Sequence, residues 1–479
     1  MTICSSPMIV RHAEAMLYLS NSILGSSVTE SVLRRTFFAH FCAGEDATSI
    51  VPTLKKLRSH GVGGILDYAA EADLGEASAP VLENQPSRTY PYESEAQCEA
   101  NLHIFLSAVR AVKDTTPDGF AAVKVTALGD PALLERVSNA VVELRAFFNR
   151  LDPSNSGRLT RDAFVAGWSD AFHADAEESG RVFDRIVQTS ASDGTVDVLE
   201  FTNRLSLEEM APLVQSCRSR GPLYHSALTE AECAALQLTM ARLDEVASLA
   251  RSLGVRLMID AEHSYFQPAI EHATLRLQRK HNHGYPCIFS TQQAYLVDCS
   301  TRLALDIERA RREGWHLGIK LVRGAYMLHE RERAQRLGAR SPIHPTVEDT
   351  HKSYDDAIDT LLLRSPCPDR TSLMVATHNQ ASVERTARLL LRNERGEHPS
   401  RVSSSQVYFG QLLGMADNLT FTLAAQGLKS YKYVPYGPVR EVLPYLLRRA
   451  HENADALSTA LTQRNMMLWE VLRRLTGRS

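Results

Sequence analysis

The sequence of 479 residues lacks several features that are typical of membrane proteins, metal-binding proteins and nucleic-acid-binding proteins. No apolar run approaches the roughly 18 residues of a membrane-spanning helix. The 8 cysteines are scattered, form no C-x-x-C pair and have no histidines at zinc-finger spacing, so we expect reduced thiols and no metal site. A net charge of -3 gives no reason to expect nucleic acid as a partner. A small-molecule substrate is the remaining expectation.

Two further absences concern the cofactor and the N-terminus. No complete G-x-G-x-x-G follows a strand-like run, because the nearest segment, Gly61–Leu66 (GVGGIL), lacks the third glycine. The segment before Arg34 is rich in serine and poor in acids, as a mitochondrial presequence is, but Arg11 is its only earlier arginine. A plain disordered or docking segment is therefore the open alternative.

What the sequence does contain is a series of short apolar runs, each ending in polar residues. They are Val62–Ala69, Phe120–Leu128, Val255–Glu262, Pro286–Tyr295, His316–Arg323, Ser372–Asn379, Ser405–Gln411 and Ser430–Tyr436. Runs of this length fit strands buried on both faces of a parallel sheet. Helix-period segments lie between most of them, at Ala132–Phe148, Glu230–Leu253, Tyr295–Glu313, Val347–Leu363 and Ser382–Asn393. This alternation predicts an α/β fold, a (βα)₈ barrel, with an open doubly wound sheet as the alternative.

The long interval between the second and third runs predicts an inserted helical domain. Its segments Asp152–Ala163 and Thr189–Glu200 resemble a pair of EF-hand loops, each with glycine at the sixth position. Ala163 replaces the carboxylate at the twelfth position of the first loop, and Thr189 and Ala191 replace two ligands of the second. We therefore predict a structural helix pair, with weak calcium binding as the alternative.

These observations divide the chain into four parts. We predict an N-terminal helical arm at 1–61, the first two barrel strands with their helices at 62–146, an EF-hand-like insert at 147–221, and the rest of the barrel with C-terminal lid helices at 222–479.

The active sites of (βα)₈ barrels lie at the carboxyl ends of the strands. The runs here end in Asp67, Glu71, Lys124, Asp260, Glu262, Gln292, Gln293, Lys320, Arg323, His378, Asn379, Gln411 and Tyr433. A lysine inside an apolar run needs a partner, because a buried ammonium is costly. Lys124 and Lys320 could form a Schiff base or hold a carboxylate or phosphate, and Asp260 and Glu262 are candidate ionic partners.

The densest polar patch lies in the tail, where Pro438 can open a helix with an apolar face. Tyr445 lies three and four positions before Arg448 and Arg449, and Arg448 and Glu452 form an i,i+4 pair. Guanidinium groups suit bidentate binding of carboxylate or phosphate. A solvated basic helix face is the alternative interpretation.

Five segments in this order resemble the proline dehydrogenase family: LMIDAEHSYFQPAI, FSTQQAYL, IKLVRGAYM, VATHN and YVPYGPVREVLPYLLRRAHEN. The L-V-R-G-A-Y and Y-L-x-R-R-x-x-E-N motifs together are highly specific. The resemblance extends from Thr36 to the tail helix outside the insert. An insert of this kind in the same place also resembles eukaryotic members, which are mitochondrial enzymes associated with the inner membrane.

The resemblance implies a distorted barrel that binds FAD at its mouth and no metal. It implies oxidation of L-proline to Δ1-pyrroline-5-carboxylate, with hydride transfer from C5 to flavin N5, as the first step of proline catabolism. Electrons would pass to a quinone at the matrix side of the mitochondrial inner membrane.

The resemblance also assigns residues. Arg448, Arg449 and Lys124 would hold the proline carboxylate, and Asp260 would pair with that lysine or an arginine. The wall around the ring would consist of Leu321, Ala325, Tyr326, Tyr433 and Tyr445. The flavin would contact Gln293, Lys320, Val322, Gly324, Thr377, His378, Asn379 and Glu452. Lys320 stands where bacterial relatives usually have arginine, and the bulk of Tyr433 should favour proline over hydroxyproline.

Two rival interpretations follow from the residues without the resemblance. A barrel lyase or aldolase would use Lys124 or Lys320 as a Schiff-base nucleophile. A calcium-regulated binding protein on an inactive barrel would need competent EF-hand ligands. Membrane docking through the terminal Met466–Leu475 stretch is a further possibility, against an ordinary packing helix.

Overall fold

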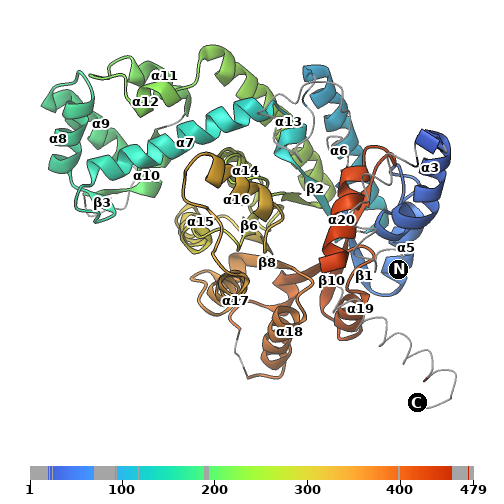
Figure 1. Ribbon diagram of the computed structural model, residues 1–479. Helices are drawn as coiled ribbons and strands as arrows, with labels where there is room; N and C mark the ends of the chain where they lie inside the picture. The colour runs from blue at the N-terminus through green and yellow to red at the C-terminus, as the bar shows by residue number, and fades with distance from the viewer. Residues whose placement is uncertain are drawn as a thin grey trace.

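The apolar runs form parallel strands that close into a barrel in the computed structural model (Figure 1). The structure describes residues 20, 22–23, 25–69, 92, 94–116, 118–187, 194–205, 207–397, 400–455 and 473. Around the barrel the order is β1 (Val62–Tyr68), β2 (Phe120–Val123), β5 (Arg256–Ile259), β6 (Ile288–Gln293), β7 (Leu317–Val322), β8 (Thr371–Ala376), β9 (Val407–Leu412) and β10 (Lys429–Tyr436). Since β10 pairs with β1, the predicted (βα)₈ barrel is confirmed and the open sheet is wrong.

The barrel is filled by side chains at the amino ends of its strands. Phe120 lies at the centre, and its ring packs edge-on against Phe289, Tyr408 and Tyr431 with centroids 5.3 Å apart in each case. Such aromatic packing closes this end of the barrel to solvent. The polar strand ends therefore surround an opening at the opposite end.

Amphipathic helices cover the outside of the barrel. They are α5 (Val51–Ser59), α6 (Glu95–Thr115), α7 (Pro131–Leu151), α13 (Glu230–Leu253), α14 (Gln267–His281), α15 (Cys299–Glu313), α16 (Met327–Arg336), α17 (Val347–Leu363), α18 (Gln380–Glu394) and α19 (Asp417–Ala425). The bounds of α13 agree with the prediction because a capping box at Thr229 begins the helix and Gly254, with φ of 71°, ends it. The helix predicted from Tyr295 begins only at Cys299, because Leu296 forms an antiparallel bridge with Ile343.

The N-terminal and C-terminal helices pack against each other at the barrel mouth. The N-terminal part contains α3 (Ser26–Leu33), a π-helical turn at Arg34–Phe38 and α4 (Ala39–Phe41), and α20 (Leu443–Asp455) follows the last strand. One apolar cluster joins Phe38 and Phe41 to Val442, Tyr445 and Leu446. This cluster fixes α20 beside β10 and β1 (Figure 1).

The insert lies to one side of the barrel, at the end of the long helix α7 (Figure 1). It contains α8 (Arg161–Ala171), α9 (Ala176–Val187), α10 (Val198–Arg204), α11 (Leu207–Val214) and α12 (Pro222–Ser226), and β3 (Arg158–Leu159) pairs antiparallel with β4 (Val196–Asp197). Its core is aromatic: Trp168 stacks on Phe164 at 4.9 Å and contacts Phe172 at 4.6 Å. Because α7 is continuous through Leu151, the predicted boundary at 147 falls inside a helix.

Two acidic residues of the insert loops, Asp152 and Asp197, already have protein partners. The Asp152 carboxylate accepts hydrogen bonds from the Ser154 hydroxyl at 2.7 Å and the Gly157 N–H at 2.6 Å. Asp197 lies 2.6 Å from Nη1 of Arg312 on α15, which ties the second loop to the barrel. No cluster that could hold a metal occurs within the described part of the chain, and positions 189–193 lie outside it. The structural role of the insert stays a prediction.

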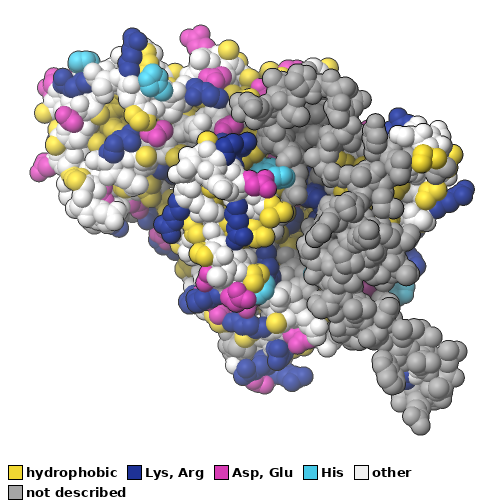
Figure 2. Space-filling model, viewed as in Figure 1, with side chains coloured by type: hydrophobic (Ala, Val, Ile, Leu, Met, Phe, Trp, Pro, Cys, Tyr) yellow, Lys and Arg dark blue, Asp and Glu magenta, His cyan; other side chains and the backbone are white. Residues whose placement is uncertain are grey.

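The surface of the insert and outer helices shows no segregation of charge: basic and acidic side chains are mixed across the visible face in Figure 2. None of the described helices is long and apolar enough to cross a membrane. The cysteines in the described residues are all free thiols. The Met466–Leu475 stretch lies almost wholly outside the described residues.

Candidate active site

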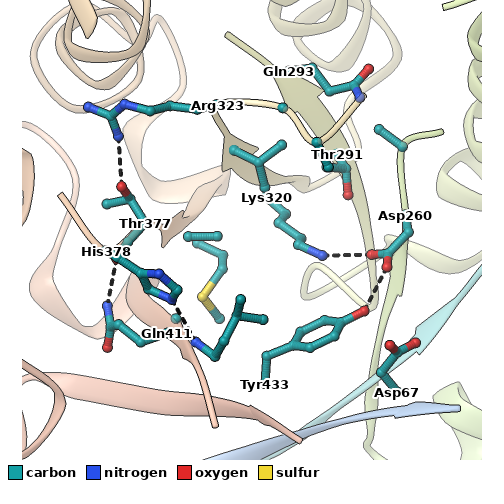
Figure 3. Close-up of a pocket in the computed structure, with 18 of the residues that line it drawn as sticks. Asp67, Asp260, Thr291, Gln293, Lys320, Arg323, Thr377, His378, Gln411 and Tyr433 are labelled. Carbon is teal, nitrogen blue, oxygen red and sulfur yellow. Dashed lines mark hydrogen bonds and ion pairs between the residues drawn. The ribbon is translucent and has the colours of Figure 1, made fainter. Parts of the chain in front are cut away.

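A cavity of about 480 Å³ opens at the carboxyl ends of the barrel strands (Figure 3). This volume is within the range of small-molecule sites. Most of the predicted site residues line it: Lys124, Asp260, Gln293, Lys320, Val322, Gly324, Ala325, Tyr326, Thr377, His378, Asn379, Tyr433, Tyr445, Arg448 and Arg449. The fold thus brings together residues that are separated by more than 300 positions in the sequence.

Leu321 does not reach this cavity. Side chains alternate along a strand, so Lys320 and Val322 face the cavity while Leu321 points outward. Leu321 is buried in the core between the barrel and its outer helices, where it shares a cluster with Tyr354. We therefore withdraw it from the substrate wall. The side chain of Glu452 lies outside the described residues, so its assignment stays a prediction.

Two strand-end residues also point away from the cavity. Gln292 faces outward from β6 and donates to Asp306 at 2.7 Å. Glu262 is fully buried just after β5, where its carboxylate accepts a hydrogen bond from the Thr126 hydroxyl at 2.6 Å. Burial raises the pKa of Glu262 to about 7.

The centre of the cavity is an ion pair between β5 and β7. Nζ of Lys320 lies 2.6 Å from Oδ1 of Asp260, and the Tyr433 hydroxyl donates to Oδ2 at 2.7 Å (Figure 3). Burial disfavours the charged Asp260, but the ammonium groups of Lys320 and Lys124 and these hydrogen bonds outweigh it, and the pKa of Asp260 lies below its usual value. The carboxylate is thus ionised at neutral pH.

Lys124 forms a second ion pair in the cavity. It lies 3.3 Å from Asp67, at the end of the neighbouring strand β1, and both side chains are buried. Asp260 forms its closest ion pair with Lys320 from β7, while Lys124 acts on it electrostatically, so the expected pairing of Asp260 with Lys124 or an arginine stays a prediction. Burial and the nearby Asp260 and Asp67 carboxylates raise the pKa of Tyr433 well above its usual value, so its hydroxyl remains a donor.

The paired arginines of α20 complete one side of the cavity. The guanidinium carbons of Arg448 and Arg449 lie 5.9 and 5.1 Å from the centroid of the Tyr445 ring, and Arg449 is only 6% exposed. Burial, with Arg449 and Lys432 nearby, lowers the pKa of His378 to about 3. Its neutral ring accepts a hydrogen bond from the Leu412 N–H at 3.0 Å. The solvated-face alternative is wrong for Arg449.

A turn after β7 adds Arg323, for which we predicted no particular role. Arg323 donates to Thr377 at 2.7 Å, to Ser382 at 3.0 Å and to His351 at 3.0 Å, so its guanidinium is fixed beside the β8 end. At the next residue, Gly324, φ is 135° and a Cβ atom would lie 2.5 Å from the Tyr295 ring. Only glycine allows this turn at the cavity edge.

Other lining residues carry weak sequence signals. Ile65, Thr291 and Met374 each lie two positions before a lining residue on their own strands, so strand alternation could have identified them. His351 comes from α17, and no pattern in the sequence places it at the cavity.

Among the described side chains that line the cavity, cations outnumber carboxylates. Lys124, Lys320, Arg323, Arg448 and Arg449 line it against the carboxylates of Asp67 and Asp260. An excess of buried positive charge favours ligands with carboxylate or phosphate groups. Gln293 adds a buried Oε1 atom that accepts no hydrogen bond within the described residues, while its amide donates to the Glu262 carbonyl at 3.2 Å. A ligand N–H group would satisfy this acceptor.

Comparison with known proteins gives one consistent result. The sequence model of the family described as "Proline dehydrogenase" matches residues 50–461. "Proline dehydrogenase 1, mitochondrial" of Homo sapiens is 37% identical, over 99% of this chain and 85% of that protein. "Hydroxyproline dehydrogenase" of Rattus norvegicus is 32% identical, over 100% of this chain and 90% of that protein.

A similar fold occurs in solved structures. Proline utilization A from Bdellovibrio bacteriovorus, inactivated by N-propargylglycine, superposes with a TM-score of 0.57 at 17% identity, over 90% of this chain. The matched region is 34% of that longer chain. At this identity the likeness concerns the fold.

Proposed function

The chain belongs to the proline dehydrogenase family, and we propose that it oxidises L-proline to Δ1-pyrroline-5-carboxylate with FAD bound in the barrel mouth. Proline oxidation is the first step of proline catabolism, and the chain is an oxidoreductase of that step. The observation that carries the proposal is the excess of positive charge around the Asp260–Lys320–Tyr433 centre. Proline offers one carboxylate, and FAD offers a pyrophosphate, to such a surface.

We assign the proline carboxylate to Arg448 and Arg449, assisted by Lys124. Guanidinium groups form paired hydrogen bonds with carboxylates, and low exposure strengthens them. Arg449 is nearly buried and both arginines flank the Tyr445 ring, so one rigid surface presents them. Tyr433, Tyr326 and Ala325 would then contact the pyrrolidine ring from other sides of the cavity.

The residues present fit FAD. Lys320, Val322 and Gly324 lie along one strand end, and Thr377, His378 and Asn379 follow the next, which forms a continuous edge for a flat ring. The free acceptor of Gln293 and the fixed cation of Arg323 supply hydrogen-bond and phosphate partners. When bound, FAD would take the hydride from proline C5 at its N5 atom. The protein's contribution is orientation and exclusion of water.

Asp260 has a positioning role in this proposal. Its ionised carboxylate fixes both the Lys320 ammonium and the Tyr433 hydroxyl, and thereby balances one of the buried cations. Lys320 is bound at 2.6 Å in an ion pair, which argues against a free nucleophilic amine and hence against the aldolase alternative.

Hydroxyproline is the second candidate substrate, since relatives named for that activity are 30% and 32% identical to this chain. Tyr433 argues for proline, because its ring lies in the cavity wall and its hydroxyl is held by Asp260. A 4-hydroxyl group would have to be placed against this ring.

The relatives named mitochondrial support a mitochondrial enzyme. We further propose that a quinone accepts the electrons, at the matrix side of the inner membrane. The purified protein can be assayed with a soluble quinone and, separately, with an artificial dye as the electron acceptor. The comparison shows whether the quinone is reduced at a rate similar to that of the dye.

The decisive experiment is an absorption spectrum of the purified protein after saturation with FAD and removal of excess. We expect a bound flavin spectrum that is bleached anaerobically by L-proline. Borohydride added with proline should trap no substrate on lysine. A protein without flavin after saturation, or borohydride-trapped lysine, would contradict the proposal.

A further inference from the structure

Strand β10 carries a buried lysine, Lys432, that does not line the active-site cavity. Its neighbours Tyr431 and Tyr433 face the barrel interior, and side chains alternate along a strand, so Lys432 points outward. Its side chain is only 1% exposed. A buried ammonium group is costly unless it is paired and hydrogen-bonded. The proposed oxidation of proline does not use this residue, so its burial requires another explanation.

The ammonium group of Lys432 has three acceptors in a single turn. Its Nζ atom lies 2.7 Å from Oδ1 of Asp417. It also donates to the carbonyl oxygen of Met415 at 2.5 Å and to that of Leu412 at 3.3 Å. All three acceptors belong to the turn 412–417, which joins β9 to α19. Lys432 therefore fastens this turn to β10.

The turn contains a residue that must be held in place. Ala416 has φ of 52° and ψ of 38°, in the left-handed region. This region is disfavoured for a residue with a Cβ atom and persists only where the surroundings impose it. Lys432 binds the carbonyl group of Met415 and the carboxylate of Asp417, on either side of Ala416. Without the ammonium group, we expect the turn to relax.

The same turn fixes a side chain of the proposed flavin site. The N–H group of Leu412 donates to Nε2 of His378 at 3.0 Å (Figure 3). The ring of His378 is neutral, and because Nε2 accepts this hydrogen bond, the proton of the ring is on Nδ1. His378 lines the cavity. The turn thus sets both the orientation and the tautomer of a ring at the flavin edge.

We infer that Lys432 is a positioning residue of the flavin site: it holds the turn 412–417, and through the Leu412 N–H group it fixes the ring of His378. The inference rests on the proposed function, since it takes FAD as the ligand of His378. The proline carboxylate is assigned to the arginines of α20, which Lys432 does not hold. Its loss should therefore affect binding of FAD and leave binding of proline nearly unchanged.

The test is a titration of the full chain, stripped of flavin, with FAD, followed by steady-state kinetics at saturating FAD. Lys432→Met should raise the Kd for FAD by about tenfold or more, and KM for proline should change by less than about twofold. Lys429→Met is the matched control, because Lys429 lies on the same strand at the opposite end of the barrel and donates to the Ser405 carbonyl at 2.7 Å. It should leave both constants unchanged.

A double variant tests the route through His378. His378→Ala removes the ring that the turn holds, so adding Lys432→Met to it should raise the Kd for FAD by less than about twofold. Fully additive effects of the two substitutions would overturn the inference, since Lys432 would then act on FAD independently of His378.

Asp417 supplies a second route in case Lys432→Met does not fold, because its side chain is 42% exposed. Asp417→Ala should raise the Kd for FAD by about threefold or more, whereas Asp417→Asn, which keeps an oxygen that can accept from Lys432, should remain closer to the native value. Unchanged FAD binding in Lys432→Met or in Asp417→Ala, or an equal loss in Lys429→Met, would overturn the inference alone. A native chain that binds no FAD would overturn the proposed function, and the inference with it.

Discussion

The buried pair of Lys320 and Asp260 allows a quantitative test of how the cavity is held together. The side chains are 9% and 11% exposed, and their charged atoms lie 2.6 Å apart. Removing one partner of such a pair leaves an uncompensated charge and costs about 3–5 kcal/mol. We expect Asp260→Asn to lower the free energy of unfolding by about 3 kcal/mol. Asparagine keeps an oxygen that can accept from Tyr433, so the change reports mainly the lost charge.

The double variant separates this charge effect from other losses. Lys320→Met alone leaves Asp260 without its nearest cation, while Lys320→Met with Asp260→Asn leaves neither charge. The loss in the double variant should therefore be smaller than the sum of the two single losses, by about 2 kcal/mol. Urea unfolding of the four proteins at pH 7 measures it. Asp356→Asn, which breaks the exposed Lys352–Asp356 pair, should leave the urea midpoint unchanged. Additive losses would refute the reasoning.

The pH dependence of the same cycle has a defined sign. The pKa of Asp260 is lowered in the folded protein, so its ionised form stabilises the fold. That contribution is complete above the ordinary carboxyl pKa of about 3.9 and is lost as the pH falls through the lower folded value. The stability difference between the native chain and Asp260→Asn should therefore shrink only in acid.

Four further outcomes are expected. Arg448→Gln or Arg449→Gln should raise KM for proline about tenfold or more with unchanged flavin content, measured by steady-state kinetics and the flavin spectrum. Loss of flavin instead would contradict the assignment of the proline carboxylate to these arginines. Tyr433→Ser should raise the ratio of kcat/KM for hydroxyproline to kcat/KM for proline by about tenfold. An unchanged ratio would contradict the placement of Tyr433 in the wall around the substrate ring. Burial raises the pKa of Glu262 to about 7, so the folded state keeps a proton that the unfolded chain releases as the pH rises. The free energy of unfolding, measured by urea unfolding, should therefore fall by about 3 kcal/mol between about pH 4.3 and 7. In Glu262→Gln this pH-dependent part of the free energy of unfolding should be absent. Calorimetric titration with calcium should show no micromolar affinity, because loop acids such as Asp152 already have partners, and such an affinity would refute the structural role of the insert.

The sequence was sufficient for the barrel because periodicity carries that information. Each of the eight apolar runs overlaps a strand, and the bounds of α13 and α17 agree with their predicted ranges. The predicted boundary of the insert at 147 falls within α7. This helix is one amphipathic element that contacts both the barrel helices and the insert, so no change of pattern marks position 147.

For the site, the sequence alone determined which residue types stand at strand ends and that the tail carries an arginine pair beside a tyrosine. It could not determine which charges meet. Asp260 and Lys320 are 60 positions apart and Lys124 and Asp67 are 57 apart, and only the folded barrel brings the ends of their strands together. The outward position of Leu321 and the inward position of His351 likewise depend on strand register and helix packing. Partner choice is decided by distances of a few ångströms, which exist only once the tertiary structure has formed.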